Sequence, residues 1–229
     1  MTSTVIADEQ ALPIFEKLKY IFSVKIMWLL LINIFSSGTM IAFENNLAQI
    51  ATSYGYPAKK VSNFVLLMCV SRFFGSLLVG NLKSIQVSKI NFIMGVTIMM
   101  ILSSLASFLA LAIEGRDFLY CVIIIEGFCM GVSWGLQFEL LGEFYREEVQ
   151  SILFSSAQIG GVIGNFLFSK YIIALIYDFQ AKRQLGEKGV GGTALNCVGD
   201  ECFRISLYVM AALTAASLVP CGFLWRTFL

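Results

Sequence analysis

The sequence contains no histidine and has few charged residues. Among its 229 residues, 14% are charged and 58% are hydrophobic, and the mean hydropathy is +0.80. A soluble domain has roughly a quarter of charged residues, so this composition excludes an ordinary cytosolic enzyme. Without histidine, serine–histidine catalysis, histidine metal ligands and histidine proton relays are also excluded.

Aspartate is absent from the places where an intramembrane enzyme would need it. Asp8, Asp117, Asp178 and Asp200 lie outside the long apolar runs or at their edges, whereas a membrane aspartyl protease needs two aspartates that meet in the bilayer. The net charge of +1 provides no electrostatic footprint for nucleic acid. We therefore predict that the chain is not an enzyme and that it uses no cofactor, no metal and no nucleic-acid partner.

Long apolar runs are abundant. A spanning helix needs about 20 apolar residues, and six runs reach that length, at residues 26–50, 61–80, 90–113, 118–141, 152–177 and 205–225. Because lipid offers no partners to backbone polar groups, we expect all six to be α-helical. Residues 1–20 form a polar and then amphipathic N-terminal segment, and residues 21–229 form a transmembrane domain with a long polar loop at 178–203. The predicted fold is an all-α, multi-pass integral membrane protein with six transmembrane helices.

Charged residues are unevenly distributed among these runs. The first contains Glu44, the second Arg72, the fourth Glu126 and Glu139, and the fifth Lys170, while the third and sixth contain none between their flanks. Charges within a membrane normally face a bundle interior or a wet cavity. We therefore expect the first, second, fourth and fifth helices to surround a polar space, with the other two at the periphery. This period of three resembles the 3+3 repeats of secondary transporters.

Polar residues near these charges are the candidates for binding a solute or a coupling ion. They are Glu44, Asn45, Asn46, Gln49, Arg72, Glu126, Ser133 and Gln137. Glu126, Ser133 and Gln137 share one helix face. Glu126 could bind a cationic substrate or carry a coupling proton, and the alternative is a static partner for Arg72, a backbone group or a hydroxyl.

Small residues recur at steps of four on two of the expected helices. They are Gly127, Gly131 and Gly135 on the fourth, and Ser156, Gly160 and Gly164 on the fifth. Such residues allow helix backbones to approach closely in lipid. The pattern predicts close seams, which either pack statically or slide during a conformational cycle.

Two cysteines flank a short stretch of the long loop. Cys197 and Cys202 are separated by Val-Gly-Asp-Glu, and they could form a disulfide if the loop is extracytoplasmic. Two thiolates without histidine would leave a zinc site incomplete. Basic residues flank the runs almost equally on the two sides, so charge alone favours cytoplasmic termini only slightly.

Two motifs, one at each end of the long loop, resemble those of a known family. The motifs Y-D-x-x-A and C-x-G-x-x-C-F-R, found at residues 177–181 and 197–204, are similar to those of the nodulin-like branch of the major facilitator superfamily. Further similar elements are N-N-x-x-Q-I at residues 45–50, the group Arg72, Gly75 and Gly80, and the pairs Trp134-Gly135 and Glu143-Phe144. The resemblance extends from the first predicted helix to the sixth.

This resemblance implies that the six helices correspond to the second half of a twelve-helix transporter with cytoplasmic termini. In that fold, the first and fourth helices of each half line a cavity, the second and fifth flank it, and the third and sixth lie outside. Alternating access there is a rocking of one half against the other. The expected function is transport of a small solute by a half-length or truncated transporter that pairs with a second six-helix half or with itself. The alternative is a non-transporting membrane subunit or remnant that binds a partner membrane protein.

Overall fold

The computed structural model describes residues 14–82, 89–185 and 197–228. These residues form helices and connecting turns, with no strand among them, so the all-α class is confirmed for this part of the chain. The elements are α1 (Ile14–Ile21), α2 (Val24–Ser53), α3 (Ala58–Leu82), α4 (Lys89–Glu114), the 3-10 helix η1 (Gly115–Phe118), α5 (Leu119–Phe144), α6 (Glu147–Leu167), the π-helix η2 (Phe168–Ile173), α7 (Ala174–Leu185), α8 (Glu201–Ala216) and α9 (Leu218–Phe228).

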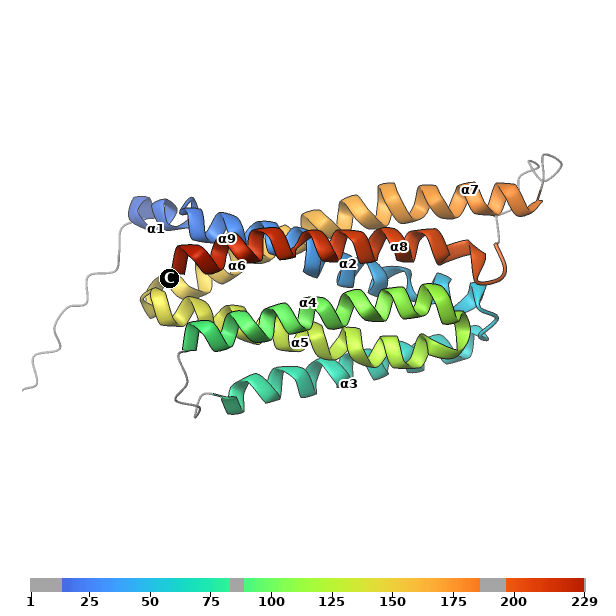
Figure 1. Ribbon diagram of the computed structural model, residues 1–229, viewed down its shortest axis with the longest axis horizontal. Coiled ribbons are helices and arrows are strands. Elements are labelled where there is room, and N and C mark those ends of the chain that lie inside the picture. Colours follow the sequence, from blue (N-terminus) through green and yellow to red (C-terminus); the bar gives the residue numbers. More distant parts are fainter. Residues whose placement is uncertain (1–13, 83–88, 186–196, 229) are drawn as a thin grey trace, which may run out of the picture.

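Five stretches of the described chain are long and apolar enough to cross a membrane. They are Val24–Ser53, Lys59–Asn81, Ile90–Phe144, Glu147–Gln184 and Glu201–Phe228. The third has 55 residues and contains both α4 and α5, which are 26 residues long each and are joined by η1. Gly115, the first residue of η1, has a φ of +64°, a conformation that residues with a Cβ rarely adopt. The chain reverses there, and α4 and α5 lie side by side (Figure 1).

Of the loop expected at residues 178–203, residues 186–196 lie outside the described part, and both ends of the expected range are helical. Helix α7 continues to Leu185, and α8 begins at Glu201. The prediction began the loop where the apolar run ends, but the residues after Tyr177 include Gln, Ala, Lys, Arg and Leu, which favour helix regardless of hydropathy. Of the N-terminal segment at residues 1–20, residues 1–13 lie outside the described part, and the remainder belongs to α1.

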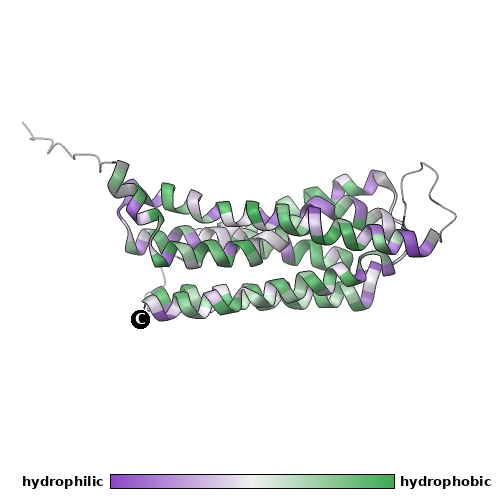
Figure 2. Ribbon diagram, turned by 90° about the horizontal axis from the view of Figure 1, so that it is seen from above, coloured by the Kyte–Doolittle hydropathy of each residue, from purple (hydrophilic) through white to green (hydrophobic). Residues whose placement is uncertain are grey.

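The long helices run along one common axis (Figure 1). Helix α2 packs extensively against α6, and α3 against α5, while α4 packs against α5 and α8, and α8 and α9 also contact α2. Hydrophilic residues are most frequent at the two ends of the bundle, with hydrophobic residues between them (Figure 2). This distribution matches a bilayer that is crossed along the long axis.

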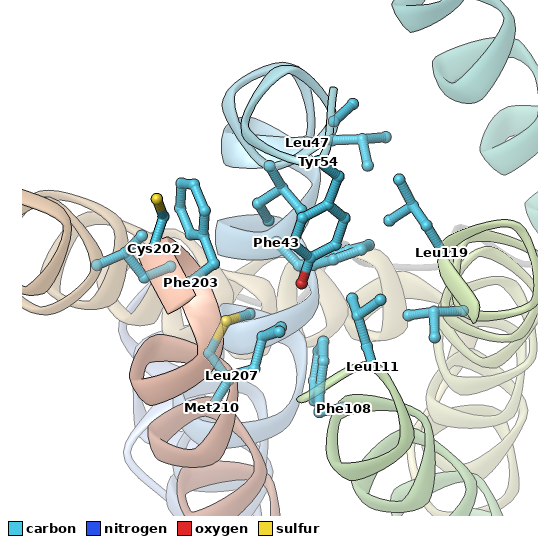
Figure 3. Close-up of a cluster of buried hydrophobic side chains, with 14 of the residues drawn as sticks. Phe43, Leu47, Tyr54, Phe108, Leu111, Leu119, Cys202, Phe203, Leu207 and Met210 are labelled. Carbon is cyan, nitrogen blue, oxygen red and sulfur yellow. The ribbon is translucent and has the colours of Figure 1, made fainter. Parts of the chain in front are cut away.

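The two ends of the bundle carry different parts of the chain. Helix α1 and the C-terminus lie at one end, and the turns α2–α3 and α4–α5 with the start of α8 lie at the other (Figure 1). Near this second end, buried side chains of α2, α4, α5 and α8 form a hydrophobic cluster (Figure 3). Phe43, Phe108, Leu119 and Phe203 are members with almost no exposed surface, so this cluster joins helices that are distant in sequence.

Glycines lie where the paired helices approach most closely. A Cβ on Gly38 of α2 would lie 2.7 Å from the Cα of Gly164 on α6, and one on Gly127 of α5 would lie 2.5 Å from the carbonyl oxygen of Met68 on α3. Real Cβ atoms do not approach other atoms this closely. The glycines noted in the sequence therefore lie in the α2–α6 and α3–α5 seams, where close packing holds helices together in lipid.

Candidate functional site

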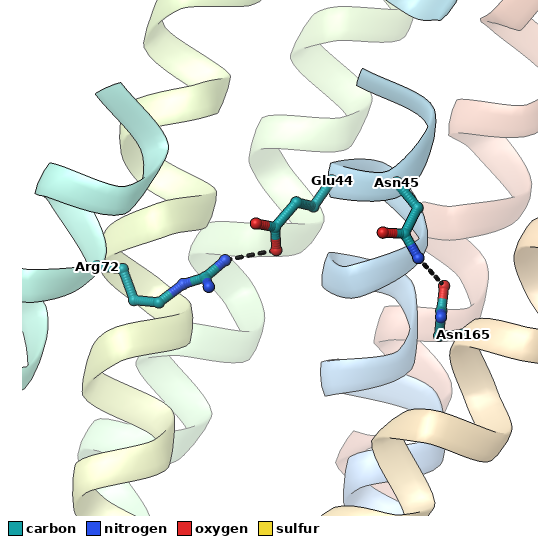
Figure 4. A network of polar contacts seen from close by, with 4 residues as sticks. All are labelled: Glu44, Asn45, Arg72 and Asn165. Carbon is teal, nitrogen blue, oxygen red and sulfur yellow. Dashed lines mark hydrogen bonds and ion pairs between the residues drawn. The ribbon is translucent and has the colours of Figure 1, made fainter. Parts of the chain in front are cut away.

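An ion pair joins α2 to α3. Arg72 Nη2 donates to Glu44 Oε2 at 2.5 Å, and the two side chains keep 22% and 23% of their surface exposed. Figure 4 shows Arg72 extending from α3 toward Glu44 on α2. Pairing lowers the cost of placing both charges inside a membrane. The partner of Arg72 is thus Glu44 and not Glu126, which the sequence left open as an alternative.

Trp134 of α5 packs against this ion pair. The guanidinium carbon of Arg72 lies 5.6 Å from the centroid of the indole ring, within the range of a cation–π interaction. Two nitrogen donors here, Arg72 Nε and Trp134 Nε1, are buried without a hydrogen-bond partner among the described residues. Most buried polar atoms in proteins do have a partner, so these two adjacent donors are an exception.

Asparagines connect α2 to the helix formed by α6 and η2. Asn45 Nδ2 donates to Asn165 Oδ1 at 2.9 Å (Figure 4), and Asn46 Nδ2 donates to Ser169 Oγ at 2.8 Å. Ser169 and the exposed Lys170 belong to the π-helix η2. Short π-helical segments within α-helices occur frequently at functional sites. The ion pair, the asparagine contacts and η2 therefore form one polar region across α2, α3, α5 and α6.

A buried cluster of amides lies closer to the end of the bundle that carries α1 (Figure 1). Asn33 Nδ2 donates to Gln137 Oε1 at 2.8 Å, and Gln137 Nε2 donates back to Asn33 Oδ1 at 3.0 Å. Gln158 Nε2 also donates to Gln137 Oε1, and Ser37 donates to Asn33 Oδ1. The cluster links α2, α5 and α6. On α2, Asn33 and Glu44 are eleven positions apart, which at 1.5 Å per residue corresponds to about 16 Å along the axis.

Glu126 lies apart from this polar region. Its fully buried carboxylate accepts hydrogen bonds from Ser104 Oγ, at 2.9 Å to each oxygen, and from Ser107 Oγ, both on α4. No ion pair of Glu126 is found in the described part of the chain. Glu126 and Gln137 share one face of α5 but have different neighbours. Glu126 contacts α4, whereas Gln137, nearer the other end of α5, contacts α2 and α6.

Two other predicted residues have no role in these contacts. Gln49 is exposed on α2, one turn beyond the asparagines, and Ser133 is 8% exposed on α5 between Glu126 and Gln137. Several residues that complete the clusters were not predicted: Asn33, Ser104, Ser107, Gln158, Asn165 and Ser169. Each is a single uncharged polar residue within an apolar run, and such residues also occur as plain helix-packing groups. Their sequence positions therefore gave no distinguishing signal.

The loop before α8 is closed by a disulfide between Cys197 and Cys202. Gln184, near the end of α7, exchanges two hydrogen bonds with the backbone of residue 198. The backbone N–H of Gly199 donates to the carbonyl oxygen of Ser53 at 2.8 Å. The element that carries the C-x-G-x-x-C-F-R motif thus connects the ends of α2, α7 and α8.

Asp200 adds a contact at the same end of the bundle. Its carboxylate lies against Gly115, where it would collide with a Cβ if Gly115 had one. Burial, together with the negative charge of Asp200, raises the pKa of the Tyr54 phenol above its ordinary value. Tyr54 belongs to the hydrophobic cluster of Figure 3.

An apolar cavity of about 660 Å³ lies between α3, α4 and α5. Its walls include Phe74, Met100, Ile124 and Phe128, and neither Glu44 nor Arg72 lines it. Among the described residues, no group of three or more Cys, Asp or Glu lies close enough together to hold a metal ion. The polar chemistry of this part of the chain is thus concentrated in the region around the ion pair, the amide cluster and Glu126.

Long apolar helices and polar groups buried between them define an integral membrane protein of the transporter type. The chain belongs to the Major Facilitator Superfamily, whose family model matches residues 3–169. Members of this superfamily are transporters. No curated protein and no solved structure matched the chain.

Proposed function

We propose that the chain is a secondary carrier of a small solute, with the solute path along the polar region of α2, α3, α5 and α6. The observation that carries this proposal is the ion pair of Glu44 and Arg72, which lies within two candidate membrane spans and keeps about a fifth of each side chain exposed. Ionisable residues at such positions usually face a water-filled cavity and belong to substrate or ion pathways.

The exposed part of this region needs a cover. Asn45 and Gln49 are exposed on the same helix as Glu44, and polar side chains facing lipid are unfavourable. We propose that a second six-helix unit lies over it, supplied by another half or by a second copy of the chain. In this arrangement α4 and α5 each cross the membrane, which makes six crossings in two groups of three.

The position of the chain within the superfamily is also part of this proposal. The C-x-G-x-x-C-F-R element forms a disulfide-closed loop at the end of the bundle opposite α1 and the end of α9 (Figure 1). The resemblance to the nodulin-like branch covers this element, the asparagines of α2, and Arg72 with Trp134. We therefore assign the helices to the C-terminal half of a transporter of that branch.

Cysteine accessibility tests the proposed solute path. In a background where the exposed Cys69 and Cys121 are changed to serine, single cysteines replace Asn45 or Gln49 on α2, and Met99 or Leu109 on α4. All four positions are exposed, so they differ in environment and not in steric access. A charged, water-soluble thiosulfonate reagent should modify the α2 cysteines and spare those on α4.

Equal modification of the two pairs, or preferential modification of α4, would contradict the proposed path. A dry α2 surface would instead identify this region as a packing surface for a partner membrane protein. Uptake by vesicles that contain the chain together with its covering unit then measures transport itself.

A further inference from the structure

The two unpartnered donors beside the ion pair indicate what kind of solute this region accepts. Arg72 Nε and Trp134 Nε1 are both buried and both lack an acceptor among the described residues. Leaving a buried donor unsatisfied is costly. Both groups can only donate, because guanidinium and indole nitrogens carry no acceptor site. A ligand that satisfies them must therefore bring acceptor atoms.

From these donors we infer that the transported solute carries an oxyanion group, such as a carboxylate, which binds at Arg72 and Trp134. This inference rests on the solute path proposed above. The planar guanidinium presents several N–H groups in a fork that matches the two oxygens of a carboxylate. The bond to Glu44 uses one terminal nitrogen of Arg72, so the buried Nε still lacks an acceptor among the described residues.

The charges in this region favour an anion over a cation. Arg72 and Lys170 are positive and Glu44 is negative, which leaves a net charge of +1. The exposed Lys170 follows Ser169, the partner of Asn46, and its ammonium group lies 5.2 Å from the centroid of the Phe166 ring and 5.7 Å from that of Tyr171. Glu44 is already paired with Arg72, and the carboxylate of Glu126 is fully buried against α4. Both carboxylates thus already accept hydrogen bonds, from Arg72 or from the serines of α4.

The donors lie close to the accessible surface. The Arg72 side chain is 22% exposed, and Trp134 is partly exposed as a residue although its nitrogen is buried. Binding therefore requires the guanidinium, whose carbon lies 5.6 Å from the centroid of the indole ring, to shift until both donors meet the ligand. The expected solute is a small anion with at least two acceptor oxygens on one group.

Trp134 itself provides the assay. The chain has three tryptophans, and Trp28→Phe with Trp225→Phe leaves Trp134 as the single indole reporter. The purified protein is titrated with succinate, with its neutral amide succinamide and with 1,4-diaminobutane, all at constant ionic strength. Succinate should produce a saturable change in Trp134 emission, and succinamide should bind at least about tenfold more weakly, because it lacks charge-assisted hydrogen bonds.

Variants separate this site from general charge effects. Arg72→Gln should abolish the response, and Arg72→Lys, which keeps the charge but loses the fork, should weaken it by about tenfold or more. Lys170→Gln should weaken it less. Thermal unfolding provides a second readout, because succinate should raise the unfolding midpoint of the parent protein. In a chain that keeps Trp28 and Trp225, Trp134→Phe should remove this increase. Arg226→Gln, at the exposed C-terminal end of α9, is the matched control and should change nothing.

Three results would overturn the anion site: an equal response to succinamide, a response to the diamine alone, or no response to succinate. Each can be distinguished from failure of the carrier proposal. If cysteines at Asn45 and Gln49 are open to water, the solute path stands even where succinate has no effect. If those cysteines are unreactive, the path itself is contradicted.

Discussion

Among the charged residues, Glu44 and Arg72 depend most directly on each other for stability, because they form an ion pair. Removing one of them leaves the other as an unpaired charge within a membrane span. Each single change should therefore lower the free energy of unfolding by more than the intact pair contributes to it. In a cycle of Glu44→Gln, Arg72→Gln and the double variant, thermal unfolding in detergent should show an interaction energy of about 0.5–3 kcal/mol. Strictly additive effects would contradict the ion pair.

Substitutions of Glu126 should affect stability in a different way, because the partners of this carboxylate are neutral hydroxyls. Glu126→Gln keeps the size of the side chain and an acceptor oxygen for Ser104 and Ser107. Glu126→Ala removes the acceptor and leaves a void, and should destabilise by about 1–3 kcal/mol more than Glu126→Gln. The midpoint of thermal unfolding measures the difference.

The matched control for this comparison is Glu114, which is exposed at the end of α4. Glu114→Ala and Glu114→Gln should have nearly equal midpoints. If the two Glu126 variants were also equal, the hydroxyl contacts would contribute nothing to stability.

At the scale of elements, the α2–α6 seam depends on the absence of side chains. A Cβ on Gly38 would meet the backbone of Gly164 at 2.7 Å, and the backbone of a helix in this seam cannot move as a flexible side chain can. Gly38→Val should therefore separate the pair and cost about 1–3 kcal/mol or more. The same change at Gly95 on α4, where no atom lies within 4 Å of the added Cβ, should leave the unfolding midpoint within a few degrees of the parent protein.

A comparable loss at both glycines would show that valine disturbs these helices through backbone propensity alone. In that case the seam would not be the cause. Size-exclusion profiles of the two variants reveal whether the Gly38 change also alters assembly.

For the whole molecule, the sequence predicted the helices better than the contacts. Length and hydropathy locate the long helices α2 to α6 in the described residues, because a bilayer requires about 20 apolar residues for each crossing. The single helix predicted at residues 205–225 is instead two, α8 and α9. Hydropathy could not show that α7 continues to Leu185, since those residues are helical without being apolar. Charge identified Glu44 and Arg72 individually, but their pairing, and the separate position of Glu126, depend on how α5 packs against three neighbours. Pairwise geometry of this kind has no signature in a single chain.

The two ends of the molecule allow a test of its orientation. Helix α1 and the C-terminal end of α9 lie at one end and the disulfide loop at the other (Figure 1), and we expect the loop to be extracytoplasmic, where disulfides persist. In intact cells that carry the chain in the plasma membrane, with Cys69 and Cys121 changed to serine, an impermeant maleimide should label Cys197 and Cys202 only after mild reduction. The variant with serine at both loop positions should stay unlabelled. Labelling that requires permeabilised cells would place the loop in the cytoplasm and reverse the orientation of every helix.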